Sequence, residues 1–181
     1  MKYIYHRVPD NMHGKILYPL NRLKTIYPKI YKKEVAKYFW RRPIMRIKIK
    51  ILNCLWNEVI HSMAVNPKDL EKTLKNLGSN SNKKLSFFKI PISKLDISKI
   101  AVYLFRKEPK KGWISSELRE DDLKKFYPKN IKKYSIVPYR SKVYFKEHVK
   151  NGSYLLFVGI PHILYKGNID VSDCKKINIT V

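Results

Sequence analysis

The stretch FFKIPISKLDISKIAVYLF, residues 87–105, decides the fold class, because it joins two short apolar runs through turn residues. Both runs are rich in β-branched and aromatic residues and are bounded by Pro or Asp, which is typical of β-strands. The same texture continues to the end of the chain. We therefore predict strands over LSFFKI (85–90), IAVYLF (100–105), SYLLFVGI (153–160), HILYKG (162–167) and KKINITV (175–181).

Helical patterns dominate the first half of the chain. The run NPKDLEKTLKNLG begins with Asn66 as an N-cap and Pro67 at the first helical position, and it ends at Gly78. This punctuation predicts a helix over 66–77 with a leucine face. A second helix is predicted to begin at Pro28 and to run through Trp40, with one apolar face and one basic face.

A third amphipathic helix is predicted for KIKILNCLWNEVIHSM, residues 48–63. The spacing of its large apolar residues indicates a buried stripe made of Leu52, Leu55, Trp56, Val59, Ile60 and Met63. Cys54, Asn57, Glu58 and His61 would then lie together on the opposite side.

The remaining segments complete an α+β fold. A short strand is predicted at 3–6, turn chemistry at PDNMHG (9–14), and short helices at 115–126 and 139–152. Helices mainly in the N-terminal half and strands late in the chain predict a mixed or antiparallel sheet core. The length favours one domain, residues 1–181.

The chain is strongly basic: 39 Lys and Arg face 14 Asp and Glu, for a formal net charge of +25. Such an excess favours a polyanionic partner, nucleic acid first and an anionic membrane second. Abundant Lys, Asn, Ile and Tyr offer a compositional explanation, because an AT-rich genome encodes them. Two cysteines indicate no disulfide framework and no zinc site. Without a long apolar run, the chain is expected to be soluble and cytoplasmic.

The densest basic stretch is 29–50, with nine Lys or Arg and one Glu. The residues we expect to contact nucleic-acid phosphates are Arg41, Arg42, Arg46, Lys48 and Lys50. The aromatic residues of this stretch fall on the predicted core stripe, so phosphate binding is the stronger part of the prediction and base stacking the weaker.

Six further residues, at three places in the chain, are candidates for chemistry. His6 and Arg7 stand where the first strand ends, which suits a phosphate or amide contact, although an edge strand also gains solubility from such a pair. On the predicted 48–63 helix, His61 beside Glu58 forms a plausible general base, and Asn57 could bind the same ligand; the alternative is an ordinary polar face. His162 is a catalytic candidate or a hydrogen-bonded packing residue.

Three stretches together resemble the ADP-ribosyltransferase fold. YIYHRVPDNMHGKILYPLN (3–21) is similar to its opening strand, His and turn, FFKIPISKLDISKIAVYLF to its central strand pair, and PHILYKGNIDVSDCKKINITV (161–181) to its closing strand–turn–strand. The resemblance implies NAD as substrate, with His6 contacting the NAD amide or ribose. The fold usually carries a catalytic Glu on a late strand, near His162 of this chain, where no Glu stands. Either Glu58 supplies the carboxylate, or the chemistry differs, or activity is lost.

The resemblance extends to nucleic-acid-directed branches, which include DNA-modifying toxins and tRNA 2′-phosphotransferases. The function it implies is NAD-dependent transfer of ADP-ribose to nucleic acid, in a toxin with a neutralising antitoxin protein or in an anti-phage effector. The alternatives are a non-enzymatic, basic nucleic-acid-binding or regulatory module, and a secreted effector that acts on host protein.

Overall fold

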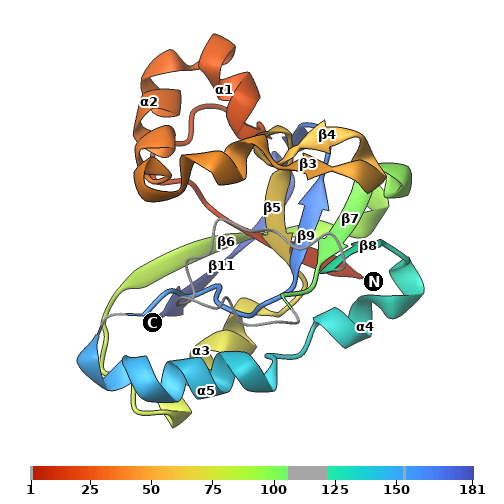
Figure 1. Cartoon of the computed structure of the whole chain (residues 1–181). Helices are drawn as coiled ribbons and strands as arrows, with labels where there is room; N and C mark the ends of the chain where they lie inside the picture. Colours follow the sequence, from red (N-terminus) through yellow and green to blue (C-terminus); the bar gives the residue numbers. More distant parts are fainter. Residues whose placement is uncertain (1, 106–121, 153) are drawn as a thin grey trace.

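A twisted antiparallel sheet forms the centre of the protein in the computed structural model, which describes residues 2–105, 122–152 and 154–181 (Figure 1). Within these residues its seven strands follow the order β11-β6-β1-β5-β9-β7-β8. Their bounds are β1 Tyr3–Arg7, β5 Ile60–Met63, β6 Lys84–Pro91, β7 Ile100–Tyr103, β8 Leu123–Lys125, β9 His162–Tyr165 and β11 Lys175–Thr180. Two small two-stranded sheets accompany it: β2 (Ile16–Leu17) pairs with β10 (Ile169–Asp170), and β3 (Lys48–Ile49) forms a hairpin with β4 (Cys54–Leu55).

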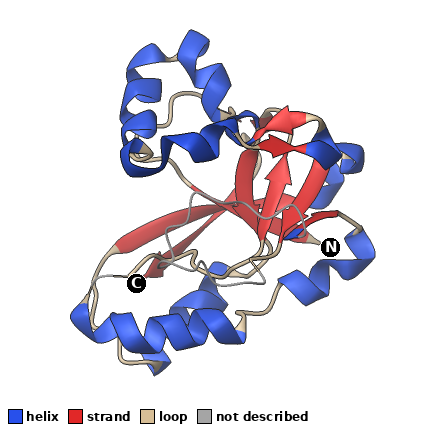
Figure 2. Ribbon diagram, in the orientation of Figure 1, coloured by secondary structure: helices blue, strands red, loops and turns tan. Residues whose placement is uncertain are grey.

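Helices lie at two opposite ends of this sheet (Figure 2). The α-helices are α1 Leu20–Ile26, α2 Pro28–Ala36, α3 Pro67–Asn76, α4 Ile131–Tyr134 and α5 Tyr139–His148. The 3-10 segments are η1 Phe39–Arg46, η2 Lys50–Leu52, η3 Trp56–Glu58, η4 Ile92–Lys94, η5 Ile97–Lys99, η7 Pro128–Asn130 and η8 Val149–Asn151. Figure 1 places α1 and α2 beside the β3–β4 hairpin, and α3 and α5 on the other side of the sheet. Of the described helices, none is both long enough and apolar enough to pass through a bilayer.

The sheet has an apolar core on each face, because successive side chains of a strand point to opposite faces. Ile4 of β1 packs into one core, whereas its neighbour Tyr5 packs into the other. In β6, Phe88 and Phe87 divide in the same way. The α+β fold with an antiparallel sheet is thus confirmed.

The helix predicted at 66–77 is confirmed as α3. The Asn66 side chain accepts a hydrogen bond from the Lys68 backbone N–H at 3.0 Å, which caps the first turn. Leu70 and Leu74 are fully buried against the sheet. After the last turn, Gly78 adopts φ +89°, a left-handed conformation that glycine favours.

The helix predicted at 48–63 is wrong, because this segment forms β3, η2, β4, η3 and β5 in succession. Asn53 adopts φ 45° and turns the chain between β3 and β4, and the Trp56 N–H donates to the Ile47 carbonyl at 2.9 Å. The predicted stripe is nevertheless buried, except for Leu55, which is 36% exposed. A series of turns and short strands therefore produced the same apolar spacing as a helix.

The predicted first strand, the helix at 139–152 and four of the five late strands are confirmed. The helix predicted from Pro28 through Trp40 forms as α2 but ends at Ala36. Its predicted core stripe is not buried, because α2 contains no buried residue and Phe39 is 58% exposed.

The strand predicted at 153–160 is wrong: from Tyr154 onward the described residues form a loop of tight turns. Gly159 sits in this loop at φ +72°, and a Cβ there would meet the Arg140 side chain at 2.7 Å. The helix predicted at 115–126 lies partly outside the described residues, and its end forms strand β8 instead.

Candidate functional site

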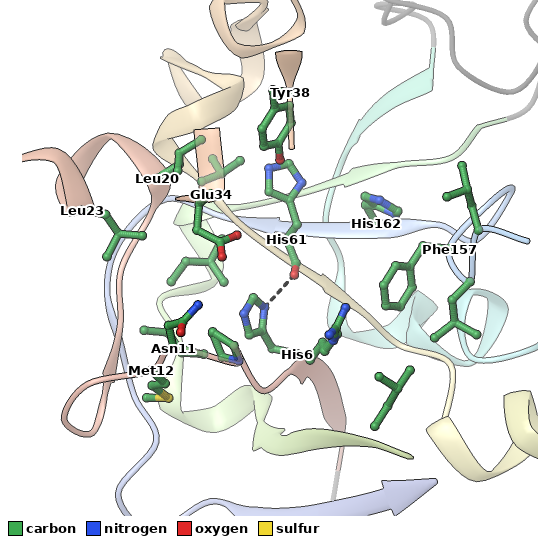
Figure 3. A pocket seen from close by; sticks show the side chains of 18 of the residues that line it. His6, Asn11, Met12, Leu20, Leu23, Glu34, Tyr38, His61, Phe157 and His162 are labelled. Atoms are coloured by element: carbon green, nitrogen blue, oxygen red, sulfur yellow. Dashed lines mark hydrogen bonds between the residues drawn. The ribbon is translucent and has the colours of Figure 1, made fainter. Parts of the chain in front are cut away.

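A pocket of about 700 Å³ opens between the sheet, the α1–α2 pair and the loop 154–159 (Figure 3). It is lined by apolar, aromatic and titratable side chains from segments that are distant in sequence. The lining residues used below are His6, Arg7, Ile30, Glu34, Tyr38, Trp56, His61, Tyr103, Phe105, Leu155, Val158 and His162.

Three histidines reach this pocket from three neighbouring strands. His6 comes from β1, His61 from β5 and His162 from β9, and these strands are consecutive in the sheet. In the register, Met63 of β5 stands opposite His162. The ring centroids of His61 and His162 are 6.0 Å apart in an edge-to-face arrangement. The antiparallel topology thus brings together three of the histidines that the sequence marked as candidates.

Each of these imidazoles uses one ring nitrogen to donate to a backbone carbonyl. His6 Nδ1 lies 2.8 Å from the His61 oxygen, His61 Nε2 lies 3.2 Å from the Trp56 oxygen, and His162 Nδ1 lies 3.0 Å from the Ile160 oxygen. Because a carbonyl only accepts, these nitrogens carry the proton, and in a neutral ring the other nitrogen is the acceptor. The backbone therefore fixes the orientation and the tautomer of all three rings.

His6 has a perturbed acid–base equilibrium. Burial lowers the pKa of its imidazole, and this effect outweighs the hydrogen bond to the His61 carbonyl and the nearby Glu34 carboxylate, both of which raise it. The ring is therefore neutral at physiological pH. Its second nitrogen can then accept a hydrogen bond from a ligand hydroxyl or amide.

Aromatic rings form the wall beside His61 and His162. Trp56 lies 4.5 Å from His61 and 5.6 Å from Tyr103, measured between ring centroids. Phe105 lies 4.3 Å from Tyr103 and 4.8 Å from His162. Trp56 is 5% exposed, so the prediction that it belongs to the core is confirmed, although it also borders the pocket. Such a wall suits a planar heterocyclic ligand.

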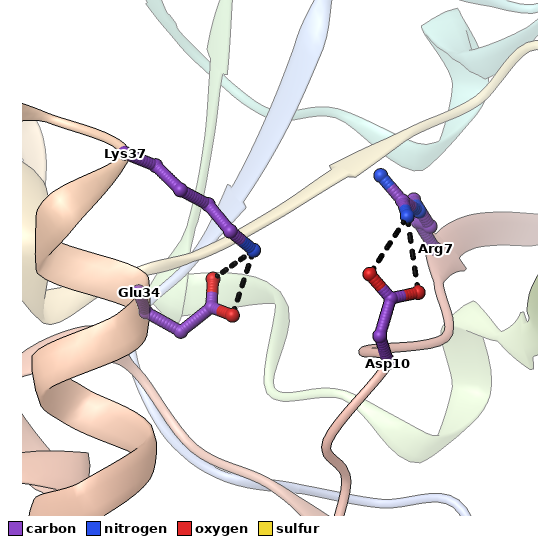
Figure 4. Close-up of polar contacts among 4 residues, drawn as sticks. All are labelled: Arg7, Asp10, Glu34 and Lys37. Atoms are coloured by element: carbon purple, nitrogen blue, oxygen red, sulfur yellow. Dashed lines mark hydrogen bonds and ion pairs between the residues drawn. The ribbon is translucent and has the colours of Figure 1, made fainter.

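Two ion pairs place opposite charges at the pocket (Figure 4). The Arg7 guanidinium lies 3.1 Å from both carboxylate oxygens of Asp10, and Lys37 lies 2.7 Å from both oxygens of Glu34. The side chains of Arg7 and Asp10 are 36% and 69% exposed. An ion pair this exposed contributes little to stability, so an anionic ligand can take the place of Asp10 at Arg7.

Glu34 is a site residue that the sequence reasoning missed. Figure 3 shows its carboxylate directed toward the pocket interior, on the same side as Tyr38. Among the described lining residues it is the only acid. A pattern could have revealed it, because Ile30, Glu34 and Tyr38 recur every four residues and place a carboxylate within an apolar helix face.

The candidates Asn57 and Glu58 do not share this pocket; neither is among its described lining residues. Glu58 instead accepts a hydrogen bond from the Leu55 N–H at 2.8 Å and from the Asn21 side chain at 3.3 Å. These contacts cap η3 and tie it to α1. The arrangement of Asn57, Glu58 and His61 on one helix face is therefore wrong.

The residues predicted to bind nucleic acid also lie outside the described pocket lining. Arg46, Lys48 and Lys50 are exposed on η1, β3 and η2. Arg41 and Arg42 belong to η1, but their side chains lie outside the described part of the chain. Their predicted contact with phosphate stays a prediction.

The chemistry of the site does not match a metal centre. Across the described residues, no three His, Cys, Asp or Glu side chains are grouped so that they could hold a metal ion. The pocket offers three oriented imidazoles, the Arg7 guanidinium, the Glu34 carboxylate and an aromatic wall, and His13 and Lys83 also line it. Comparison with protein-family models, with curated proteins and with solved structures gives no significant match for this chain.

Proposed function

We propose that the pocket binds NAD and that the protein transfers ADP-ribose from NAD to nucleic acid. The observation that carries this proposal is the convergence of His6, His61, His162 and Arg7 on one pocket that also holds an acid, Glu34. The volume of about 700 Å³ suits a ligand of dinucleotide size. The resemblance of the first strand and turn to the ADP-ribosyltransferase fold supports the same ligand.

Each group has a role in binding. The Arg7 guanidinium would leave Asp10 and pair with the pyrophosphate, for which its planar fork of donors is well matched. Neutral His6 would accept a hydrogen bond from a ribose hydroxyl or from the carboxamide. Trp56 and Phe105 border the place where a planar ring would lie.

Glu34 is the carboxylate we propose for the transfer step, in place of Glu58. When the bond from ribose C1′ to the pyridinium nitrogen breaks, its electron pair goes to the ring, and nicotinamide leaves as a neutral molecule. The ribose then carries the positive charge, which a nearby carboxylate stabilises. A nucleophilic atom of the nucleic acid attacks C1′ and loses one proton, which His162 or His61 can accept.

Such an activity would damage the nucleic acid of the cell that makes it. A neutralising antitoxin protein therefore belongs to the proposal. The second candidate function is a basic nucleic-acid-binding module without catalysis, which the net charge of +25 favours independently of the pocket.

Titration calorimetry with NAD tests the pocket directly. A charge-assisted contact is worth about 1.5–3 kcal/mol, so Arg7→Ala is expected to weaken NAD binding about tenfold or more, and His6→Ala is expected to weaken it as well. Arg46→Ala is the matched control, because it removes an exposed arginine from outside the described lining and should leave the affinity unchanged. Absence of heat at millimolar NAD would leave the binding module as the function.

The chemical step needs a separate measurement. Glu34→Gln keeps the shape of the side chain and removes its charge. We expect this variant to bind NAD but to release nicotinamide far more slowly, since the carboxylate acts on the developing charge. A variant that releases nicotinamide at the wild-type rate would remove Glu34 from the mechanism.

A further inference from the structure

A second basic region of the chain differs from 29–50 in where its aromatic residues lie. Between Lys124 and Lys150 there are nine Lys or Arg and one acid, Glu147. Two tyrosines of this region are exposed to solvent: Tyr127 is 47% exposed and Tyr139 is 82% exposed. The Tyr139 ring is four-fifths exposed, so it does not contribute to core packing and is available to contact a ligand.

Helix α5 separates its apolar and basic residues into two faces. Tyr144 and Phe145 are buried in the core, and Val149 follows them there. The outer face of α5 carries Tyr139, Lys142, Val143 and Lys146, which recur at the three- and four-residue spacing of one helix face. Lys150, in the following η8, is also exposed. The apolar face of α5 is therefore already occupied, and the face left to solvent is basic and aromatic.

The lysines of this region are not neutralised within the protein. Among the residues that the structure describes, none of Lys124, Lys125, Lys129, Lys132, Lys133, Lys142, Lys146 and Lys150 forms an ion pair. Other basic residues do have acidic partners: Lys68 and Lys75 pair with Glu71, and Lys94 pairs with Asp173. The positive charge of the 124–150 region is thus available to an external anion.

We infer that the outer face of 124–150 binds single-stranded nucleic acid. We call it the α4–α5 surface; it comprises the eight lysines named above with Tyr127 and Tyr139. Lysines would contact successive phosphates, and the two exposed rings would stack on bases. In a duplex the bases are stacked on one another, so they are not available to stack on the two tyrosine rings. A membrane is the poorer fit, since α5 has no unoccupied apolar face to insert into lipid.

The buried face of α5, on the inner side of this surface, is hydrogen-bonded to the wall of the pocket. The Tyr144 hydroxyl accepts a hydrogen bond from the Leu155 N–H at 3.0 Å, and Ser141 Oγ donates to the Val158 carbonyl at 2.8 Å. Leu155 and Val158 both line the pocket. Helix α5 therefore lies between the α4–α5 surface and the loop that lines the pocket. The inference rests on nucleic acid being the acceptor of the proposed function, but binding itself requires no NAD.

Fluorescence anisotropy with a labelled oligonucleotide of about 12 nucleotides tests the surface. The double variant Lys142→Gln/Lys146→Gln removes two charges from α5, and Lys32→Gln/Lys33→Gln removes two from the exposed face of α2 as the matched control. Gln resembles Lys in helix propensity, so both variants should fold. We expect the α5 pair to lower the log–log salt slope by about 1.4, which is two phosphates at about 0.7 each, and the α2 pair to leave it unchanged. If the α2 pair lowers the salt slope and the α5 pair does not, the inference is overturned, and the basic stretch 29–50 is the nucleic-acid-binding surface.

Substitution of Tyr139 tests the contribution of base stacking without changing the charge of the surface. Tyr139→Ala should keep the wild-type melting temperature, because the ring is exposed, and should weaken single-strand binding about five- to a hundredfold. Tyr139→Phe keeps the ring and should bind like the wild type. Equal affinity of Tyr139→Ala and wild type would overturn the inference, as would binding to anionic vesicles without binding to the oligonucleotide.

The outcomes for the surface and for the pocket are distinguishable. Single-strand binding through α5 without NAD binding supports this surface and defeats the transferase. NAD binding with no oligonucleotide binding in any variant supports the pocket and overturns the surface. DNA and RNA oligonucleotides of one sequence show which strand is preferred.

Discussion

The two ends of the sheet carry pairs of helices of similar length, but these pairs are packed differently. Helices α1 and α2 contain no buried residue, whereas α3 buries Leu70 and Leu74 completely and α5 buries Phe145 completely. The large apolar side chains of α2 are only half-covered, and one of them, Ile30, lines the pocket. One pair of helices therefore completes a core, and the other pair forms the wall of a cavity that a ligand would fill.

The largest expected effect tests this difference through stability. Phe145→Ala should lower the free energy of unfolding by about 3–5 kcal/mol, because it leaves a cavity in a closed core. Ile30→Ala in α2 should cost less than about 1 kcal/mol, since the pocket already exposes that side chain to solvent. Denaturant titration of both variants measures the contrast. Equal losses would mean that α2 belongs to the core as much as α5 does.

The same contrast explains what the sequence could predict. Helix α3 was predictable because Asn66, Pro67 and Gly78 act locally, on the backbone of the helix that they begin and end. The structure of the segment 48–63 was not predictable, because a helix and a series of turns with short strands can both have this apolar spacing. There the deciding residue is Asn53, whose left-handed conformation reverses the chain.

The site was predictable only in part, for a related reason. His6, Arg7, His61 and His162 could be named as candidates from their residue types and local surroundings. Their convergence depends on strand order, which places β5 between β1 and β9 and which no local pattern encodes. Glu34 is harder to identify from the sequence, because the apolar and basic faces of its helix dominate the local pattern.

The second expected effect is protection of the α1–α2 pair by ligand. In the free protein, amides of α2 should exchange with solvent much faster than those of α3, because α2 buries no side chain. At a hundred times its dissociation constant, NAD should stabilise the pocket by about 2.7 kcal/mol against local opening and slow the exchange of α2 about a hundredfold. Amides of α3 serve as the internal control and should not change. Unaltered exchange in α2 at saturating NAD would show that the ligand does not contact this wall.

The smallest expected effect is a pH dependence of stability that arises from His6, on the pocket side of the sheet. Burial lowers the pKa of His6 below its ordinary value of 6.5, so the unfolded chain takes up this proton first as the pH falls. The stabilisation that the neutral ring provides is complete above about pH 6.5 and is lost as the pH falls toward the pKa of the folded state. On the α3 side, Glu71 accepts hydrogen bonds from Lys68, Thr180 and Lys75, which lower its pKa to about 2, so it stays ionised over the same range.

His6→Asn isolates this contribution. The Asn side-chain amide can donate to the His61 carbonyl as Nδ1 does, but it does not titrate. Melting temperatures of wild type and variant, measured from pH 7.5 to 5.5, should diverge on acidification, with the wild type losing more. The nearby Glu34, His61 and His162 are common to both proteins, so the comparison isolates the substituted side chain. Parallel curves would show that the His6 proton is not linked to folding, and its neutral form would then no longer support a role as hydrogen-bond acceptor for NAD.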